Sequence, residues 1–182
     1  MLRAETSVEI DLQEQMAYLL QNGRPVLASP ISSGRYGHLT KTGSFETLEK
    51  ERTHYSSMYG KIVDARGNTV VADADADMQV PSGEKFIPAP MHYFMRFHGA
   101  DGMHAGYLPG YPASHGCVRM PEQYAIAFFN AVRVGTPVTV FGRTPVNRYY
   151  SGQPQPALPR RPGFAPPFDP RFPPPPPGVW WR

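Results

Sequence analysis

Residues Gly102–Pro121 read GMHAGYLPGYPASHGCVRMP and contain Cys117, the single cysteine among 182 residues. His115 lies two residues before this cysteine, and Arg119 lies two residues after it. A free cysteine is most often a small buried hydrophobe, but here a glycine precedes it and a helical pattern soon follows, which indicates an exposed thiol at a sharp turn. Nearby cations and the free N–H groups of a helix N-terminus lower a thiol's pKa toward neutrality. The pattern therefore favours a nucleophilic cysteine whose thiolate attacks a carbonyl.

A nucleophilic cysteine needs a base, and four histidines lie close enough along the chain to serve Cys117: His92, His98, His104 and His115. A glycine separates His115 from the cysteine, so we expect His115 to line the site without accepting the proton. A metal site built from the last three histidines and Cys117 competes with this interpretation, but H-x-C is not the usual zinc-ligand spacing. A papain-like arrangement is disfavoured because every histidine precedes the cysteine. No metal or other cofactor is predicted.

The rest of the sequence is typical of a mainly β domain with one or two helices. Alternating or continuous apolar runs predict strands over residues 6–12, 16–20, 45–48, 91–97 and 137–141. The dipeptide Asn22-Gly23 predicts a hairpin that leads into Pro25, so the chain should open as a β-meander. The spacing of apolar residues predicts a helix over 121–134 that begins with Pro121 and stops at Gly135.

Two segments between these elements are expected to be loops. Residues 29–44 are rich in glycine and serine, which predicts a long surface loop of the kind that often carries function. Residues 55–90 are rich in turn-forming residues, and Asp73–Asp77 alternates aspartate with alanine like the opening of a calcium loop. The glycine and the final glutamate of an EF-hand are missing, so we expect a solvated acidic loop and no calcium.

Residues 143–182 differ in composition from the rest of the chain. They contain 13 of the 22 prolines and six arginines against one aspartate, whereas residues 1–142 contain 12 basic and 14 acidic residues. This proline density prevents helices and central strands, so the segment is predicted to be a disordered or polyproline-II tail. Contact with a protein partner or with the wall remains open for it. Because the positive charge lies outside the folded part, no nucleic-acid partner is predicted.

The N-terminal sequence MLRAETSVEIDL lacks the apolar segment of a secretory signal. No apolar run approaches the roughly 20 residues that span a bilayer. The residues alone therefore leave two expectations open, a cytoplasmic protein or a protein whose leader is absent from this sequence.

The segment Gly102–Pro121 closely resembles the active-site signature of the L,D-transpeptidase catalytic domain, the YkuD-type fold. In that family a histidine is followed by a glycine-containing loop and then by Ser/Thr-His-Gly-Cys-x-Arg/Asn. The resemblance extends more weakly over residues 5–142, through the opening strands, the SSGRYGHLTKTGSF loop and the closing PVTVF. It implies a YkuD-type catalytic domain, β-sandwich or barrel-like, over residues 5–142, followed by the separate Pro-rich tail of residues 143–182.

The resemblance also implies a role for each matching residue. Cys117 would be the nucleophile that takes an acyl group from a peptidoglycan stem peptide, and His104 would be its base, oriented by the backbone carbonyl of Ala105. His98 remains an alternative base, because many family members have a longer loop between the base and the signature. The implied substrate-binding residues are Ser114, His115 and Arg119, and the implied oxyanion hole is formed by the backbone N–H groups of Gly116 and Cys117.

The implied reaction is acyl transfer from a tetrapeptide stem through a Cys117 thioester, with release of D-Ala and an amine as acceptor. With water as acceptor the same site would be an L,D-carboxypeptidase, a hydrolase. A second alternative is a non-catalytic scaffold that binds the wall and displays the Pro-rich tail. The implied substrate predicts a location in the cell envelope or periplasm, although no export signal is visible in the sequence.

Overall fold

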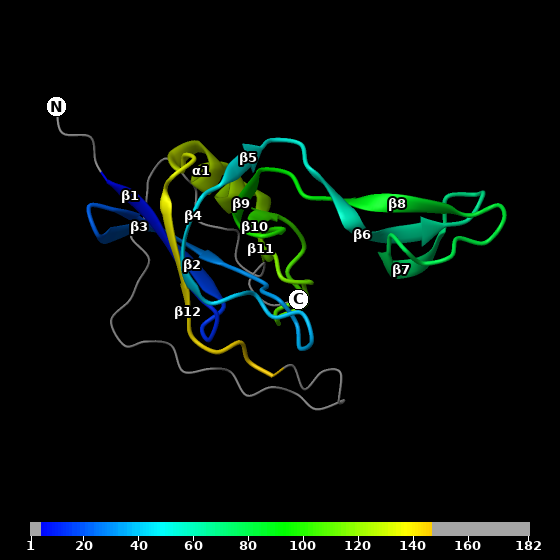
Figure 1. Cartoon of the computed structure of the whole chain (residues 1–182), viewed down its shortest axis with the longest axis horizontal. Coiled ribbons are helices and arrows are strands. Elements are labelled where there is room, and N and C mark those ends of the chain that lie inside the picture. Colours follow the sequence, from blue (N-terminus) through cyan, green and yellow to red (C-terminus); the bar gives the residue numbers. More distant parts are fainter. Residues whose placement is uncertain (1–4, 147–182) are drawn as a thin grey trace, which may run out of the picture.

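A computed structural model describes residues 5–146 and shows a mainly β fold with one helix (Figure 1). The predicted fold class is therefore confirmed, although its three sheets stay open and do not close into a barrel. The predicted tail lies outside the described residues from position 147 onward. Within the described part, no helix is long and apolar enough to cross a membrane.

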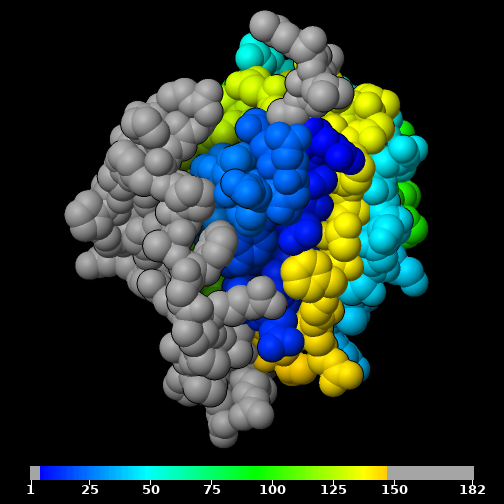
Figure 2. Space-filling view, turned by 90° about the vertical axis from the view of Figure 1, so that its left-hand side faces the viewer, coloured from blue at the N-terminus to red at the C-terminus, as the bar shows by residue number. Residues whose placement is uncertain are grey.

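The first sheet has five strands in the order β3-β2-β1-β12-β4 and contains the predicted opening meander. Figure 2 shows one side of this sheet, from blue β3 and β2 across to yellow β12 and cyan β4. Asn22 and Gly23 both have positive φ, 50° and 72°, as the tight turn of this hairpin requires. The sequence did not predict that β12 would pair with β1 in parallel. The strands are β1 (Thr6–Asp11), β2 (Met16–Gln21), β3 (Arg24–Pro30), β4 (Gly43–Glu46) and β12 (Pro137–Phe141).

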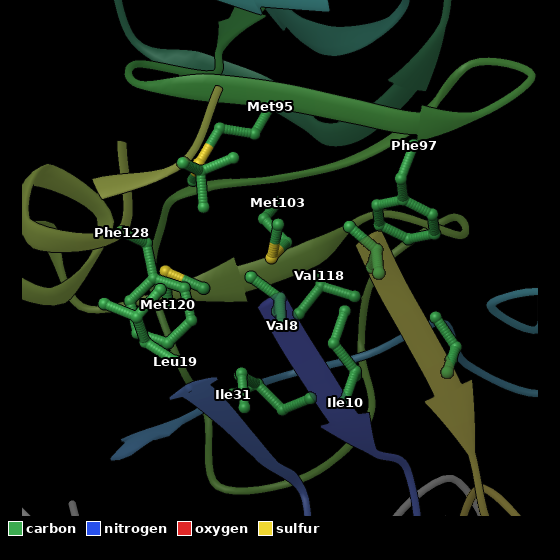
Figure 3. Packing of buried hydrophobic residues seen from close by; sticks show 14 of the residues in the cluster. Val8, Ile10, Leu19, Ile31, Met95, Phe97, Met103, Val118, Met120 and Phe128 are labelled. Atoms are coloured by element: carbon green, nitrogen blue, oxygen red, sulfur yellow. The ribbon is translucent and has the colours of Figure 1, made fainter. Parts of the chain in front are cut away.

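The second sheet has four strands in the order β11-β10-β9-β5 and packs against the single helix. The core lies between this sheet, the helix and the first sheet (Figure 3), where Val8 and Ile10 of β1 pack with Met103 and Val118. All four side chains are fully buried, which makes this cluster the main source of hydrophobic stabilisation. The elements are β5 (Glu49–Glu51), β9 (Phe94–His98), β10 (Asp101–Ala105), β11 (Val118–Met120) and α1 (Glu122–Ala131).

The third sheet, called the outer sheet below, has three strands in the order β7-β6-β8 and extends away from the other two (Figure 1). The expectation that residues 55–90 are only loop is therefore wrong. These strands leave most side chains at least partly exposed, so they carry little of the apolar alternation by which a strand is identified. Asp73 and Asp75 belong to a strand and not to an acidic loop. The strands are β6 (Tyr55–Val63), β7 (Thr69–Asp75) and β8 (Lys85–Pro90).

Several predicted boundaries shift. The helix is shorter than predicted, because Pro121 precedes it as the N-cap and Val132 is already extended (φ −78°, ψ 149°). Strand β9 begins at Phe94 because Tyr93 occupies a turn with φ 57°. The predicted strand over 45–48 is replaced by β4 and β5, which belong to different sheets.

Candidate active site

Two adjacent parallel strands, β10 and β11, carry the core of the site. Their register pairs Met103 with Val118 and His104 with Arg119. Because paired residues share a face and successive residues alternate, Met103 and Val118 point into the core while His104 and Arg119 point to the opposite face. Cys117 directly precedes β11 and belongs to the same face by this alternation. The signature thus places the predicted nucleophile, the predicted base and the predicted arginine on one face of the sheet.

The turn before Cys117 is built from glycine and from internal hydrogen bonds. Gly116 has φ +123°, and a Cβ at this position would collide with the Asp101 carboxylate. The hydroxyl of Ser114 donates to the carbonyl of Cys117, and Thr40 Oγ1 donates to the carbonyl of Gly116 at 2.7 Å. Thr40 belongs to the predicted functional loop, which therefore supports the turn from the opposite side.

The sulfur of Cys117 lies between two backbone groups. It is 3.8 Å from the carbonyl oxygen of Ala100, and the N–H of Gly102 donates toward it. The pKa of Cys117 is raised to about 11, mainly by burial; the Gly102 N–H lowers it, the Asp101 charge raises it and the Arg119 charge lowers it. The expectation of a lowered pKa at a helix N-terminus is wrong, because β11 separates Cys117 from α1. At neutral pH the thiol is protonated and needs a base to ionise.

His104 is buried and has a defined tautomer. Its Nδ1 lies 2.8 Å from the carbonyl oxygen of Ala105, the orienting contact that the resemblance implies. Since a carbonyl only accepts, Nδ1 carries the hydrogen and Nε2 is left with a free lone pair. Burial lowers the pKa of His104 to about 4, and the nearby Arg119 charge contributes to this shift. The imidazole is therefore neutral at pH 7, the form that can take a proton.

The alternative base, His98, occupies a different environment. It ends β9, and its ring packs against Phe45 with 4.9 Å between ring centroids. Its cross-strand partner is Asp101. Within residues 5–146 no direct contact joins Cys117 to the ring of either His98 or His104. The fixed tautomer of His104 and its register beside Arg119 favour His104, and the identity of the base stays a prediction.

The three predicted substrate-binding residues differ in whether their polar atoms are free to bind a ligand. Ser114 is fully buried, and its hydroxyl is used inside the turn, so the role it supports is holding the turn. His115 has 8% of its side chain exposed, because Tyr59 stacks on its ring at 3.9 Å and the Arg35 guanidinium donates to its Nε2 at 2.6 Å. The guanidinium of Arg119 makes no hydrogen bond or ion pair to any described residue. Arg119 is therefore the member of this set that can receive a ligand.

Three residues of the outer sheet and of the loop over residues 29–44 reach the site and were not predicted from the sequence. Arg35 forms an ion pair with Asp73 at 2.7 Å, and His115 Nε2 lies 3.6 Å from the same carboxylate. Tyr59, on β6, covers the His115 ring. An assignment of strands to residues 55–90 could have indicated Tyr59 and Asp73, because a sheet formed by these residues can cover the Ser-His-Gly-Cys segment.

The two N–H groups predicted as an oxyanion hole are not equivalent. The N–H of Gly116 donates to Ser114 Oγ at 3.2 Å, whereas the N–H of Cys117 has no partner among the described residues. The free donor adjacent to the nucleophile is the one that can stabilise a developing oxyanion without first breaking a contact.

As for metals, residues 5–146 contain no group of three or more His, Cys, Asp or Glu side chains arranged to hold an ion.

Several solved structures of L,D-transpeptidases are similar to this fold. An L,D-transpeptidase from Stackebrandtia nassauensis aligns with a TM-score of 0.58 and 20% identity, covering 79% of this chain and 58% of that one. L,D-transpeptidase 1 from Mycobacterium tuberculosis aligns at 0.54 with 23% identity, covering 75% and 62%. A cysteine-to-serine mutant of the Enterococcus faecium L,D-transpeptidase aligns at 0.54 with 25% identity, covering 75% and 50%. This chain thus spans less than two thirds of the length of these structures. Among curated proteins, no sequence matches this chain.

The fold, together with these structural neighbours, is that of a transpeptidase catalytic domain. The family model of the L,D-transpeptidase catalytic domain, YkuD, matches residues 5–140, and the chain belongs to that family. Members of the family act on peptidoglycan stem peptides outside the cytoplasm.

Proposed function

We propose that this chain is a peptidoglycan L,D-transpeptidase that takes an acyl group from a tetrapeptide stem onto Cys117 and releases D-Ala. The observation that carries the proposal is the hydrogen bond from His104 Nδ1 to the Ala105 carbonyl, on the same sheet face as the cysteine. That bond fixes the tautomer in which Nε2 is the proton acceptor. A scaffold protein would not need a buried histidine held in the one tautomer that serves a neighbouring thiol.

The protonation states of Cys117 and His104 support one order of events in the proposed reaction. Cys117 and His104 are both neutral at pH 7, because burial moves their pKa values in opposite directions. The thiol proton passes to His104 Nε2 as the sulfur attacks the stem carbonyl, and the Cys117 N–H stabilises the oxyanion. The imidazolium then protonates the amine of the departing D-Ala, which leaves a thioester and a neutral histidine.

Arg119 is the group proposed to hold the substrate. Its guanidinium is half-buried and unpaired among the described residues, and it lies on the same face as Cys117. Five fixed donors on a planar group suit a carboxylate, and stem peptides carry carboxylates. His115 would contribute to the pocket once Tyr59 and Arg35 release it. With this substrate, the proposed location is the cell envelope.

The test is stem-peptide turnover followed by mass spectrometry. Wild-type protein incubated with a tetrapeptide stem should lose D-Ala and gain the mass of the acyl group, and Cys117→Ala should do neither. His104→Gln should retain the fold and slow acylation by about 100-fold or more, the usual contribution of a positioned base. His98→Gln is the matched control and should acylate at the wild-type rate. Undiminished D-Ala release by Cys117→Ala would refute the proposal.

The same experiment separates the two alternatives. Hydrolysis of the thioester, with no crosslinked product in the presence of amine acceptors, would identify an L,D-carboxypeptidase. A wild-type chain that binds stem peptides without acylation would identify the wall-binding scaffold.

A further inference from the structure

Asp101 is a carboxylate beside the nucleophile that the proposed reaction does not yet use. It begins β10 at a bulge, where the register with β9 shifts between Asp101 and Gly102. Its Oδ1 lies so close to Gly116 that a methyl group there would collide with it. The sulfur of Cys117 contacts the backbone of the two residues that flank Asp101, Ala100 and Gly102. The bulge thus places the Asp101 carboxylate next to Gly116, the residue that precedes Cys117.

This carboxylate has no partner in the part of the chain that the structure describes. It accepts no hydrogen bond and forms no ion pair within residues 5–146, although it is partly buried. The titratable groups that interact with it are His98, its cross-strand neighbour, Tyr59 and Cys117. The Asp101 oxygens are not among the buried polar atoms without a partner in the described part of the chain, so they are open to solvent. A ligand that brings N–H donors and positive charge can therefore reach them.

The charge of Asp101 acts oppositely on the two halves of an acyl transfer. It disfavours the Cys117 thiolate and so slows formation of the thioester. Once the thioester has formed, the sulfur is uncharged and this penalty disappears. An ammonium group that approaches the thioester is then attracted by the same carboxylate. Asp101 therefore opposes the first half-reaction and favours the second, provided that the acceptor is an amine.

We propose that Asp101 binds the amine acceptor and takes its proton when the Cys117 thioester is resolved. This inference rests on the function proposed above. It selects a protonated amine over water as the acceptor, which makes the chain a transpeptidase in preference to a carboxypeptidase. Burial raises the pKa of Asp101 above its ordinary value, which strengthens the carboxylate as a proton acceptor.

The proton balance of the step is complete. The acceptor arrives as R–NH3+, gives one proton to Asp101, and attacks the thioester carbon with the freed lone pair. The C–S bond breaks, and the nitrogen loses a second proton to His104, which passes it to the departing sulfur of Cys117. The products are an amide, the free thiol and a protonated Asp101, which returns its proton to water. One proton is released for each amide formed, and no oxidant or further reactant is needed.

The test compares two half-reactions and two acceptors. Wild type and Asp101→Asn are acylated with a tetrapeptide stem, and D-Ala release measures thioester formation. The acyl-enzyme is then treated with glycinamide, which is largely protonated at neutral pH, or with hydroxylamine, which is uncharged. We expect Asp101→Asn to acylate at least as fast as wild type and to react with glycinamide about 100-fold more slowly. Its reaction with hydroxylamine should be unchanged.

Controls keep the outcome specific. Asp77→Asn removes an equal charge from an exposed position and should change neither half-reaction. If Asp101→Asn fails to fold, Asp101→Ser removes the charge with a smaller side chain. Equal slowing with both acceptors, or slowed acylation with normal aminolysis, would overturn the role of Asp101 and leave the proposed function standing. Absence of D-Ala release by wild type would overturn the proposed function and this inference together.

Discussion

The outer sheet and the β10–β11 pair approach the same site, but they are held in place by different forces. Met103 and Val118, on the core face of β10 and β11, are fully buried. On the outer sheet Met58 is 52% exposed and Val70 is 48% exposed. The side that carries Cys117 and His104 is thus fixed by apolar burial. The side that covers His115 has little buried surface of its own.

Polar and aromatic contacts join the outer sheet to the site. They are the Arg35–Asp73 ion pair and the stacking of Tyr59 on His115. A third contact, the edge contact of Tyr55 with His92, joins the outer sheet to the turn before β9. A partly exposed ion pair is worth about 1 kcal/mol or less, and an aromatic pair about as much. Hydrophobic burial of one large side chain exceeds each of them. Cys117 and His104 are therefore held by a well-packed core, whereas the outer sheet that covers His115 is held by weak contacts. A weakly held cover is expected where a substrate must enter.

The largest expected effect is on stability and sets the two regions directly against each other. Met103→Ala removes a fully buried side chain between the sheets and should lower the free energy of unfolding by about 2–5 kcal/mol. Val70→Ala truncates a half-exposed side chain of the outer sheet and should change it by about 0.5 kcal/mol or less. Urea denaturation measures both. Equal losses would show that the outer sheet belongs to the same cooperative core.

The second prediction concerns acid. Burial lowers the pKa of His104 from 6.5 to about 4, so between these values the unfolded chain binds a proton that the folded chain does not. Stability is therefore lost as pH falls from 6.5 to 4, by about 3 kcal/mol at most for this group. Denaturation at pH 7 and pH 4 should show this loss in wild type and in His92→Gln. In His104→Gln the loss should be smaller by that amount; an unchanged pH dependence would contradict the burial of a neutral imidazole.

The same division explains what could be predicted from the sequence. The Asn22-Gly23 hairpin, the strand over Pro137–Phe141 and the Ser-His-Gly-Cys signature are local patterns, so they were identified correctly. The parallel pairing of β1 with β12 joins residues about 130 positions apart and leaves no local pattern. The outer sheet was missed because exposed strands lack apolar alternation.

The site shows a similar limit. The sequence placed a glycine before Cys117 and a helical pattern after it, which suggested a helix N-terminus and a lowered thiol pKa. Three residues of β11 lie between them, and burial then moves the pKa upward. The position of Asp101 beside Gly116 was not predicted either, because it depends on a bulge that the neighbouring residue types do not predict.

The third prediction is the pH profile of the thiol. Because the pKa of Cys117 is raised to about 11, the thiolate fraction near neutral pH should be about 100-fold below that of a free cysteine. The rate of alkylation by iodoacetamide should rise throughout the range up to pH 10 without levelling. The urea-unfolded chain is the control and should level at the pKa of an ordinary thiol. A native plateau below pH 9 would mean that solvent reaches the sulfur more freely than the geometry of β10 and β11 allows.

The smallest expected effect tests how weakly the outer sheet is held. Asp73→Asn removes the ion pair with Arg35 and the charge near His115, at a side chain that is 56% exposed. Since such a pair contributes about 0.2–1 kcal/mol, amide hydrogen exchange in β6–β8 should accelerate by about twofold to fivefold. The free energy of unfolding should fall by no more than about 1 kcal/mol, and β10 should still exchange more slowly than β6–β8 in both proteins.

Asp77→Asn is the matched control for this measurement, because Asp77 is exposed and follows β7 without a partner on the site. Salt offers an independent check, since screening should bring wild type toward Asp73→Asn while leaving the variant unchanged. If β10 and β6–β8 exchange with the same free energy of opening, the two regions open as one unit. The substrate would then have to enter a closed site, and the contrast between a rigid catalytic face and a weakly held cover would be wrong.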